Sequence, residues 1–427
     1  MSTHADAAIR AAAATLAEPT ARVGKRFIGV YTLAFLGLWA AFFAPIQVLL
    51  AQQMELLAPG NKEAALGWVT GAGALVAMVA NPLFGAWSDR TTSRLGRRRP
   101  WILAGAVVGA LALWLLGRQH SVVAVALWWC VAQMALNAML AALNAELPDQ
   151  VPVSQRAVCG GWIGISQPLG VVLAVLLVTG LVGGIGGGYA VVAVLLLACT
   201  LPFVLTVGNA VLARGDLPAW KPGAFLGELW ILPRAHPDFA WAWAMRFLIQ
   251  LGSALGTLFL LYFLRDAVGF EQRFPGRTSE DGLVVMVLVY TVGVVIGALV
   301  SGRVSDRSGR RRRNVLIASA LMALAAVLLA LWPTWPVALA GAAVLGLGFG
   351  GYIAVEQALV SQVLPAASAR GRDLGILNIA NSAPQVLGPA VAALLVTRLG
   401  GYPALYLATA VVIVGGALLV LNIRSVA

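Results

Sequence analysis

Long apolar stretches separated by short polar segments recur along almost the whole chain. Twelve of them are long enough to cross about 30 Å of hydrocarbon as helices. They lie at residues 27–50, 64–87, 101–118, 121–145, 157–182, 187–211, 239–264, 282–302, 315–332, 335–360, 374–397 and 401–423. The pattern therefore predicts an all-α membrane protein with twelve transmembrane helices.

Composition supports a membrane location. Of the 427 residues, 60% are apolar and only 11% are charged, and the mean hydropathy is +0.88. A soluble protein keeps roughly a quarter of its residues charged, so this chain has too little polar surface for water. We expect a multi-pass protein of the cytoplasmic membrane.

The net charge of +12 would indicate nucleic acid in a soluble chain, but here it indicates topology. With both termini in the cytoplasm, the inner segments hold 22 of the 29 Lys and Arg residues and the outer loops hold six. Arg246 alone lies within a span. Because cytoplasmic loops collect basic residues, both termini are predicted to be cytoplasmic.

The second half of the chain repeats the first. Asp89 and Asp306 lie 217 positions apart, as do Pro148 and Pro365, and "QPLG" at Gln167 recurs as "QVLG" 218 positions later. One offset held at separate landmarks predicts two pseudo-symmetric six-helix halves. Such a repeat implies a binding site at the interface of the halves and a rocking motion around it.

The repeat sets the expected domain boundaries. Residues 1–26 form a flexible cytoplasmic tail, 27–211 the N-terminal half and 239–427 the C-terminal half. Between them, residues 212–238 contain four prolines around "FLGELWIL". That segment predicts a cytoplasmic linker with a short amphipathic helix on the membrane surface.

Two arginine-rich loops follow the second span of each half: "GAWSDRTTSRLGRRRP" and "GRVSDRSGRRRR". With the twelve spans and the repeat, they resemble the major facilitator superfamily, whose signature loop has the form G-x-x-x-D-R-x-G-R-R. Its elements are supplied by Gly85, Asp89, Arg90, Gly96, Arg97 and Arg98, with a few extra residues after Arg90. The longer first loop looks most like the sucrose–proton symporter branch. It is similar, more loosely, to the glycoside–cation symporters of the melibiose permease kind.

The resemblance implies that these loops form an inner gate. Each aspartate would cap the start of a helix in the opposite half, because helix N-termini attract carboxylates. The expected gating residues are Asp89, Arg90, Arg97, Arg98, Arg156, Asp306, Arg307, Arg310 and Arg372. A purely topological role for the arginines is the alternative. Nucleic-acid binding is disfavoured because the loops are short and lie between membrane helices.

Polar side chains within spans indicate a substrate pathway, because they are costly in lipid. Several fall on common helix faces of spans that, by the resemblance, line a central cavity. The expected cavity residues are Tyr31, Trp39, Gln133, Asn137, Arg246, Gln250, Tyr352, Glu356, Asn378, Asn381 and Gln385. Hydrogen bonding between helices is the alternative role for the amides.

Arg246 and Glu356 are the only opposite charges well inside the spans. Both are expected about 10–12 Å from the cytoplasmic boundary, so a salt bridge is expected. It is either a proton-coupling pair or a static structural pair. The sucrose symporters, as the resemblance implies, carry an acid within span four, whereas here no carboxylate precedes Glu146 at the end of that span.

The sequence thus predicts a secondary transporter rather than an enzyme, since it shows no nucleotide-binding loop, zinc motif or nucleophile arrangement. The leading hypothesis is proton-coupled uptake of a neutral sugar or glycoside by alternating access. A proton-coupled exporter of drugs or metabolites and a non-transporting scaffold or sensor are the alternatives. No cofactor is expected, and the coupling ion is a proton, or else sodium. A small-molecule substrate and the lipid bilayer are the expected partners of a monomer that binds no nucleic acid.

Overall fold

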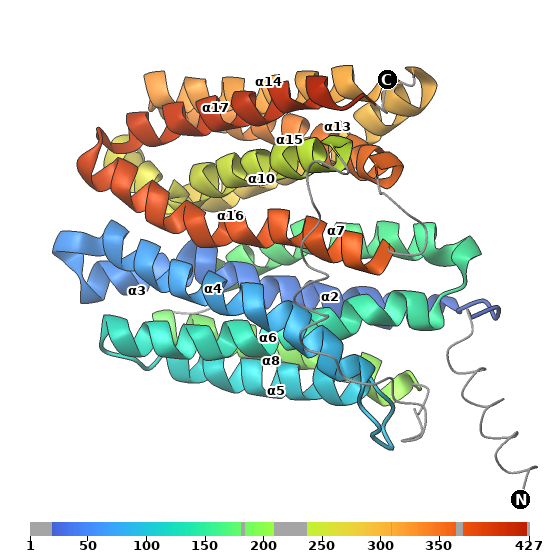
Figure 1. The fold of residues 1–427 in the computed structure, drawn as a ribbon. Helices are drawn as coiled ribbons and strands as arrows, with labels where there is room; N and C mark the ends of the chain where they lie inside the picture. Colours follow the sequence, from blue (N-terminus) through green and yellow to red (C-terminus); the bar gives the residue numbers. More distant parts are fainter. Residues whose placement is uncertain (1–18, 181–183, 209–236, 309, 364–369, 425–427) are drawn as a thin grey trace, which may run out of the picture. The chain divides into compact units, whose positions relative to one another are not determined.

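The computed structural model describes residues 19–180, 184–208, 237–308, 310–363 and 370–424, which form helices joined by turns and loops, with no strand among them. The N-terminal helices are α2 (Lys25–Ala44), α3 (Leu50–Leu57), α4 (Lys62–Asp89), α5 (Arg99–Leu116), α6 (Val122–Gln150), α7 (Val153–Gly180) and α8 (Ile185–Thr206). The C-terminal helices are α10 (Pro237–Leu258), α11 (Leu260–Tyr262), α12 (Phe270–Arg273), α13 (Ser279–Ser308), α14 (Arg311–Leu331), α15 (Trp335–Val363), α16 (Arg370–Arg398) and α17 (Gly401–Leu419). Short π-helical turns at Pro45–Leu49 (η1) and Phe263–Ala267 (η4) and 3₁₀ turns at Pro59–Asn61 (η2) and Val420–Asn422 (η6) complete the chain (Figure 1).

Eleven helical segments in the described residues are long and apolar enough to cross a membrane. Pro237–Leu258 and Leu260–Ala267, which meet at a bend of 43°, together provide a twelfth. The twelve spans predicted from hydropathy are therefore confirmed. The predicted linker helix at 212–238 falls almost wholly outside the described residues, as does most of the tail at 1–26.

The chain divides into two compact units. Unit 1 comprises Met1–Leu49 and Val76–Lys221. Within it α2 packs along α7 and α8, and α5 packs along α6 and α8. The α5–α6 contact is close at Gly105, where a Cβ would lie 2.6 Å from the carbonyl oxygen of Ala135. Close backbone approach at small residues is the usual way that helices associate in lipid.

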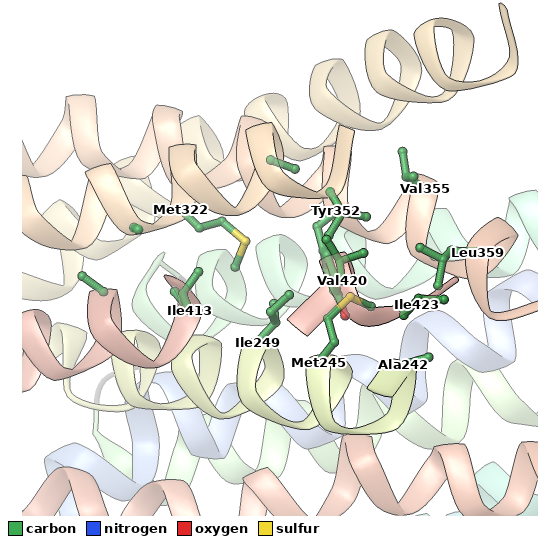
Figure 2. Close-up of a cluster of buried hydrophobic side chains, with 14 of the residues drawn as sticks. Ala242, Met245, Ile249, Met322, Tyr352, Val355, Leu359, Ile413, Val420 and Ile423 are labelled. Carbon is green, nitrogen blue, oxygen red and sulfur yellow. The ribbon is translucent and has the colours of Figure 1, made fainter. Parts of the chain in front are cut away.

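Unit 2 comprises Leu50–Leu75 and Pro222–Ala427. Here α15 packs along α13 and α14, and α10 along α16 and α17. A buried apolar cluster between α10, α14, α15 and α17 includes Met245, Met322, Tyr352 and Val355 (Figure 2).

Glycines bring α13 and α15 into backbone contact. A Cβ on Gly297 of α13 would lie 2.9 Å from the carbonyl carbon of Leu347, and one on Gly350 of α15 would lie 2.8 Å from Cα of Val294. Neither position has room for a side chain. The helix that carries Tyr352 and Glu356 is thereby held at one depth against α13.

Residues 50–75 belong to unit 2 because of specific contacts. The Tyr262 hydroxyl donates to the carbonyl of Ala51 (2.7 Å), and Gln52 Nε2 donates to Glu280 (2.9 Å). On α4, a Cβ at Gly67 would lie 2.9 Å from the carbonyl oxygen of Pro389. The division by contacts therefore cuts through α4 between Leu75 and Val76, at a different place from the repeat in the sequence.

Candidate functional site

The strongest concentration of polar side chains within the spans lies in unit 2, on α10, α15 and α16. Arg246 follows the core residue Met245, and Glu356 follows the core residue Val355. Met245 and Val355 belong to the same apolar cluster (Figure 2). Their polar neighbours therefore lie at the edge of that cluster, where α10 and α15 approach each other.

Arg246 and Glu356 form an ion pair, with 3.0 Å between Nη1 and Oε1. The Arg246 side chain is 18% exposed and that of Glu356 only 4%. Arg246 Nε also donates to Oδ1 of Asn381 at 2.7 Å, and Gln250 Nε2 donates to the same oxygen at 3.4 Å. The structure thus joins four of the expected cavity residues in one network.

The chemistry of this network follows from its burial. A charge deep in lipid is tolerated only when it is paired and hydrogen-bonded. Arg246 pairs with the Glu356 carboxylate by charge and donates a hydrogen bond to Asn381, so its guanidinium lies between α15 and α16. Glu356 Oε1 has no hydrogen-bond partner among the described residues.

Tyr352 lies one turn before Glu356 on α15 and is buried in the apolar cluster. Its hydroxyl has no hydrogen-bond partner among the described residues. Buried tyrosine hydroxyls usually find a partner. The hydroxyl is therefore available to a water or ligand beside the ion pair.

The expected cavity residues of unit 1 make contacts within their own unit. Asn137 Nδ2 donates to the backbone oxygen of Gln133 at 2.8 Å and to its side-chain Oε1 at 3.1 Å, and both residues are buried. The Tyr31 hydroxyl donates to the carbonyl of Leu143 at 2.6 Å and so links α2 to α6. Trp39 is half-buried, and its ring centroid lies 5.8 Å from that of Phe42.

Two further expected residues lie on α16. Gln385 is exposed one turn beyond Asn381. The side chain of Asn378 lies outside the described part of the chain. Gln385 does not join the Arg246 network in the described structure.

In the first arginine loop, Arg98 is the centre of the contacts. It donates to Ser88 Oγ and to Asp89 Oδ1, each at 2.5 Å, and to Asp149 Oδ2 at 2.9 Å. Arg97 binds the other oxygen of Asp149. Burial acts to lower the pKa of Arg98, but the charges of Asp89 and Asp149 outweigh it and raise that pKa above its usual value.

Asp149 is a partner of the first arginine loop that the sequence reasoning missed. It directly follows Pro148, one of the landmarks of the repeat, and it is an acid at the same predicted membrane face as the arginines. That shared face was the available signal. Its equivalent in the second half, at the same offset of 217 as Pro148 and Pro365, is Ala366.

The other expected gating residues are less fully described. Arg90 is half-buried, and Arg307 and Arg310 are exposed. The side chains of Arg156, Asp306 and Arg372 lie outside the described structure. The capping of an opposing helix by Asp89 and Asp306 therefore remains a prediction.

A second charged network in unit 2 joins α3 and α4 to the chain around η4. Lys62 Nζ lies 2.9 Å from Asp266 and 3.5 Å from Glu55. Arg265 pairs with Glu55 and lies 3.0 Å from Glu280. These pairs connect the first predicted outer loop to the loop that follows span seven.

No group of His, Cys, Asp and Glu that would suit a metal ion occurs in the described ranges. The polar groups of both units are amides, hydroxyls, carboxylates and guanidinium groups, which suit hydrogen-bonding ligands and protons.

Comparison with known proteins decides the family. The model of the Major Facilitator Superfamily matches residues 27–288 and 277–426. The chain belongs to the Major Facilitator Superfamily. It is thus a multi-pass protein of the plasma membrane, in a family of transporters rather than enzymes.

Curated relatives from the superfamily match over short segments. The general alpha-glucoside permease of Schizosaccharomyces pombe is 28% identical over 126 residues, which is 26% of this chain and 22% of the relative. Sucrose transport protein SUT1 of Oryza sativa subsp. japonica is 40% identical over 72 residues, 16% of this chain and 13% of the relative. The matched segments thus span less than a quarter of these relatives.

A solved transporter structure has the same fold. The D323A mutant of the nucleoside transporter NupG superposes with a TM-score of 0.72 at 16% sequence identity, covering 94% of this chain and 100% of that one. At this identity the likeness speaks for the fold alone.

Proposed function

We propose that this protein is a secondary transporter that takes up a neutral sugar or glycoside together with a proton, by alternating access. The observation that carries the proposal is the Arg246–Glu356 ion pair, in which a 4% exposed carboxylate lies in a membrane-spanning helix. Ionisable residues at such a depth are typical of proton relays and substrate sites in transporters.

The coupling step follows from the shared arginine. With Glu356 ionised, Arg246 links α10 to both α15 and α16. When a proton binds Glu356, its electrostatic attraction to Arg246 is lost. Arg246 then interacts with Asn381 and can bind cargo. Proton binding and cargo binding thereby become linked, as uphill transport requires.

The sugar hypothesis rests on the chemistry around the pair and on the relatives. Asn381, Gln250 and the Tyr352 hydroxyl are neutral groups able to donate and accept hydrogen bonds, which suits sugar hydroxyls. The matched segments of an alpha-glucoside permease and a sucrose transport protein point the same way. The form of the first arginine loop supports the same branch.

Uptake by reconstituted protein tests the coupling. Proteoliposomes with an imposed inward proton gradient should accumulate radiolabelled sucrose or maltose above the outside concentration. Glu356→Gln should abolish this accumulation and its pH dependence while sugar exchange at equal concentrations continues, because exchange needs no net proton movement.

Glu63→Gln is the matched control, since Glu63 is a carboxylate in the first turn of α4, away from the pair. It should accumulate sugar as the wild type does. If the Glu356→Gln variant still accumulates sugar in a pH-dependent way, Glu356 has no role in proton coupling. Accumulation driven only by an outward gradient would indicate export instead.

The class of cargo is tested separately by thermal stability of the purified protein. Sucrose, maltose and methyl glucosides are compared with uridine and with small carboxylates. A saturable rise in melting temperature with a sugar is expected because a ligand that binds only the folded state stabilises it. The sugar hypothesis is rejected if none of the sugars gives such a rise.

A further inference from the structure

The two arginine loops differ in what their buried hydroxyl groups contact. In the first loop, Ser88 Oγ accepts a hydrogen bond from Arg98, which also binds Asp89 and Asp149. Ser305 occupies the repeat position of Ser88 at the offset of 217. It is 4% exposed, and its hydroxyl has no partner among the described residues.

A second unpartnered group lies in the helix that follows Ser305. Asn314, in the first turn of α14, is 9% exposed, and its Nδ2 also lacks a partner within the described structure. Buried donors without partners cost about 1–3 kcal/mol each. Two of them at one end of one helix pair indicate that an additional group completes their hydrogen bonds.

Both groups face the same place. A Cβ at Gly351 of α15 would lie 2.6 Å from Ser301 Oγ and 3.5 Å from Ala318 Cβ, so these residues of α13 and α14 converge on α15. Ser305 is one turn beyond Ser301, and Asn314 is one turn before Ala318. Residues one turn apart share a helix face, so Ser305 and Asn314 converge at the loop end of the same junction.

The positive charge around this junction favours a negatively charged ligand. The N-cap of α14, Arg310, makes no side-chain capping bond, so the first backbone amides of this 21-residue helix have no side-chain cap. Such amides favour negative charge. Between residues 303 and 314 the chain carries six arginines and one aspartate. Both unpartnered side-chain groups can act as donors.

Arg311 stands in the register of Arg98, because each is the second residue after the loop glycine. Arg311 already has interactions of its own, but a guanidinium has five N–H donors, and Arg98 serves three partners at once. In the first loop, the carboxylate between the arginines is that of Asp149. The second half has Ala366 at that sequence position and so lacks a carboxylate there.

We propose that Ser305, Asn314, Arg311 and the first amides of α14 form a binding site for a phosphate-bearing anion. The anion accepts hydrogen bonds from the second arginine loop, as the carboxylate of Asp149 does from the first. Ser305 is the last residue of one candidate span and Arg311 is the first of the next. The site therefore lies at the membrane surface, where phospholipid headgroups supply phosphate. Free inorganic phosphate has the same chemistry.

The test is a titration of full-length protein in a neutral maltoside detergent, followed by thermal unfolding. Phosphatidylglycerol, inorganic phosphate and diacylglycerol are added separately. Phosphatidylglycerol should raise the melting temperature saturably, by about 4 °C, and diacylglycerol should not. If inorganic phosphate gives the same rise, the site is confirmed and its ligand is the free anion.

Asn314→Asp replaces a donor by a negative charge of the same shape and should weaken binding about tenfold. Ser319→Ala, which deletes another buried and unpartnered hydroxyl of α14, is the matched control and should titrate as the wild type.

Two results would overturn the site. One is the absence of a saturable shift with either phosphatidylglycerol or phosphate. The other is a wild-type response to phosphatidylglycerol in Asn314→Asp.

Discussion

At the scale of single residues, Arg246 and Glu356 depend on each other for their burial. Removing one partner of a buried pair leaves an uncompensated charge, whereas removing both leaves none. We therefore predict that Arg246→Gln lowers the free energy of unfolding by about 3–5 kcal/mol. The double variant Arg246→Gln/Glu356→Gln should recover most of that loss.

Thermal or denaturant unfolding of the purified variants measures this cycle. Equal destabilisation by the single and the double variant would mean that the pair contributes nothing as a pair. The experiment is independent of transport, so it separates the structural part of the pair from its proposed coupling role.

The two carboxylates around Arg98 should behave differently. The Asp149 side chain is 20% exposed and contacts both Arg97 and Arg98, whereas that of Asp89 is 60% exposed. Asp149→Asn should cost about 2 kcal/mol of stability, as expected for losing hydrogen bonds to charged groups. Asp89→Asn should cost less than about 1 kcal/mol but slow transport, because its expected role is in the gate.

Paired stability and initial-rate measurements on the two variants check this contrast. A large loss of stability in Asp89→Asn with an unchanged transport rate would contradict the gating role. The comparison uses the same substitution at both sites, so each variant is the control for the other.

The sequence predicts some contacts of the site better than others, depending on whether the two partners can be recognised without knowing how the helices pack. The pairing of Arg246 with Glu356 can be predicted because a charged side chain within a membrane span needs a partner of opposite charge, and few such residues occur in the spans. The amide of Asn381 is polar in the same way as many others, and only the packing of α10 against α16 selects it. Asp149 was missed because its partners lie about 50 residues away, at the other end of the α5–α6 hairpin.

At the scale of helices, the contact of α13 with α15 offers a sharp test. A Cβ at Gly350 would lie only 2.8 Å from Cα of Val294, and closer still to its carbonyl oxygen. Gly350→Ala should force the helices apart and cost about 1–3 kcal/mol, as overpacking does. It should also displace Glu356, which follows on the same helix.

Gly415→Ala is the matched control, because nothing lies within 4 Å of a Cβ at that position on α17. It should leave stability unchanged or raise it slightly, since alanine is the better helix former. Melting temperature and the yield of monodisperse protein compare the two. Tolerance of Gly350→Ala would show that the helices separate at little cost.

The helices themselves follow from hydropathy, since a span needs about 20 apolar residues. The breaks within spans cannot be predicted from hydropathy. Neither the bend after Leu258 nor the π-helical turn at Phe263–Ala267 contains a proline. They occur beside Arg265 and Asp266, whose ion pairs come from segments far away in the sequence, so local patterns carry no sign of them.

At the scale of the whole chain, the network around Arg265 should respond to acid. Burial acts to raise the pKa of Glu271, but hydrogen bonds from Ser279 and the charge of Arg265 outweigh it, so the net pKa is lowered. A carboxylate with a lowered folded pKa adds stability above its unfolded pKa of about 4.3. That stability is lost as the pH falls through the folded value.

Glu271→Gln should therefore be less stable than the wild type at pH 7, and the difference should vanish in strong acid. The effect is small because the Glu271 side chain is 46% exposed. Melting temperatures of both proteins across this pH range measure it. A difference that grows on acidification would mean that the carboxylate is not stabilised by these partners.

The pairing of Lys62 with Asp266, which are 204 residues apart, has a consequence for biosynthesis. At about 5–20 residues per second, the ribosome needs roughly 10–40 seconds to make the second residue after the first. Throughout that interval the first membrane hairpin lies in the bilayer without Arg265 and Asp266, and its Glu55 and Lys62 have only each other as ion-pair partners. A quality-control factor that recognises incompletely paired charges in membrane helices would have its longest opportunity there, before span seven is complete.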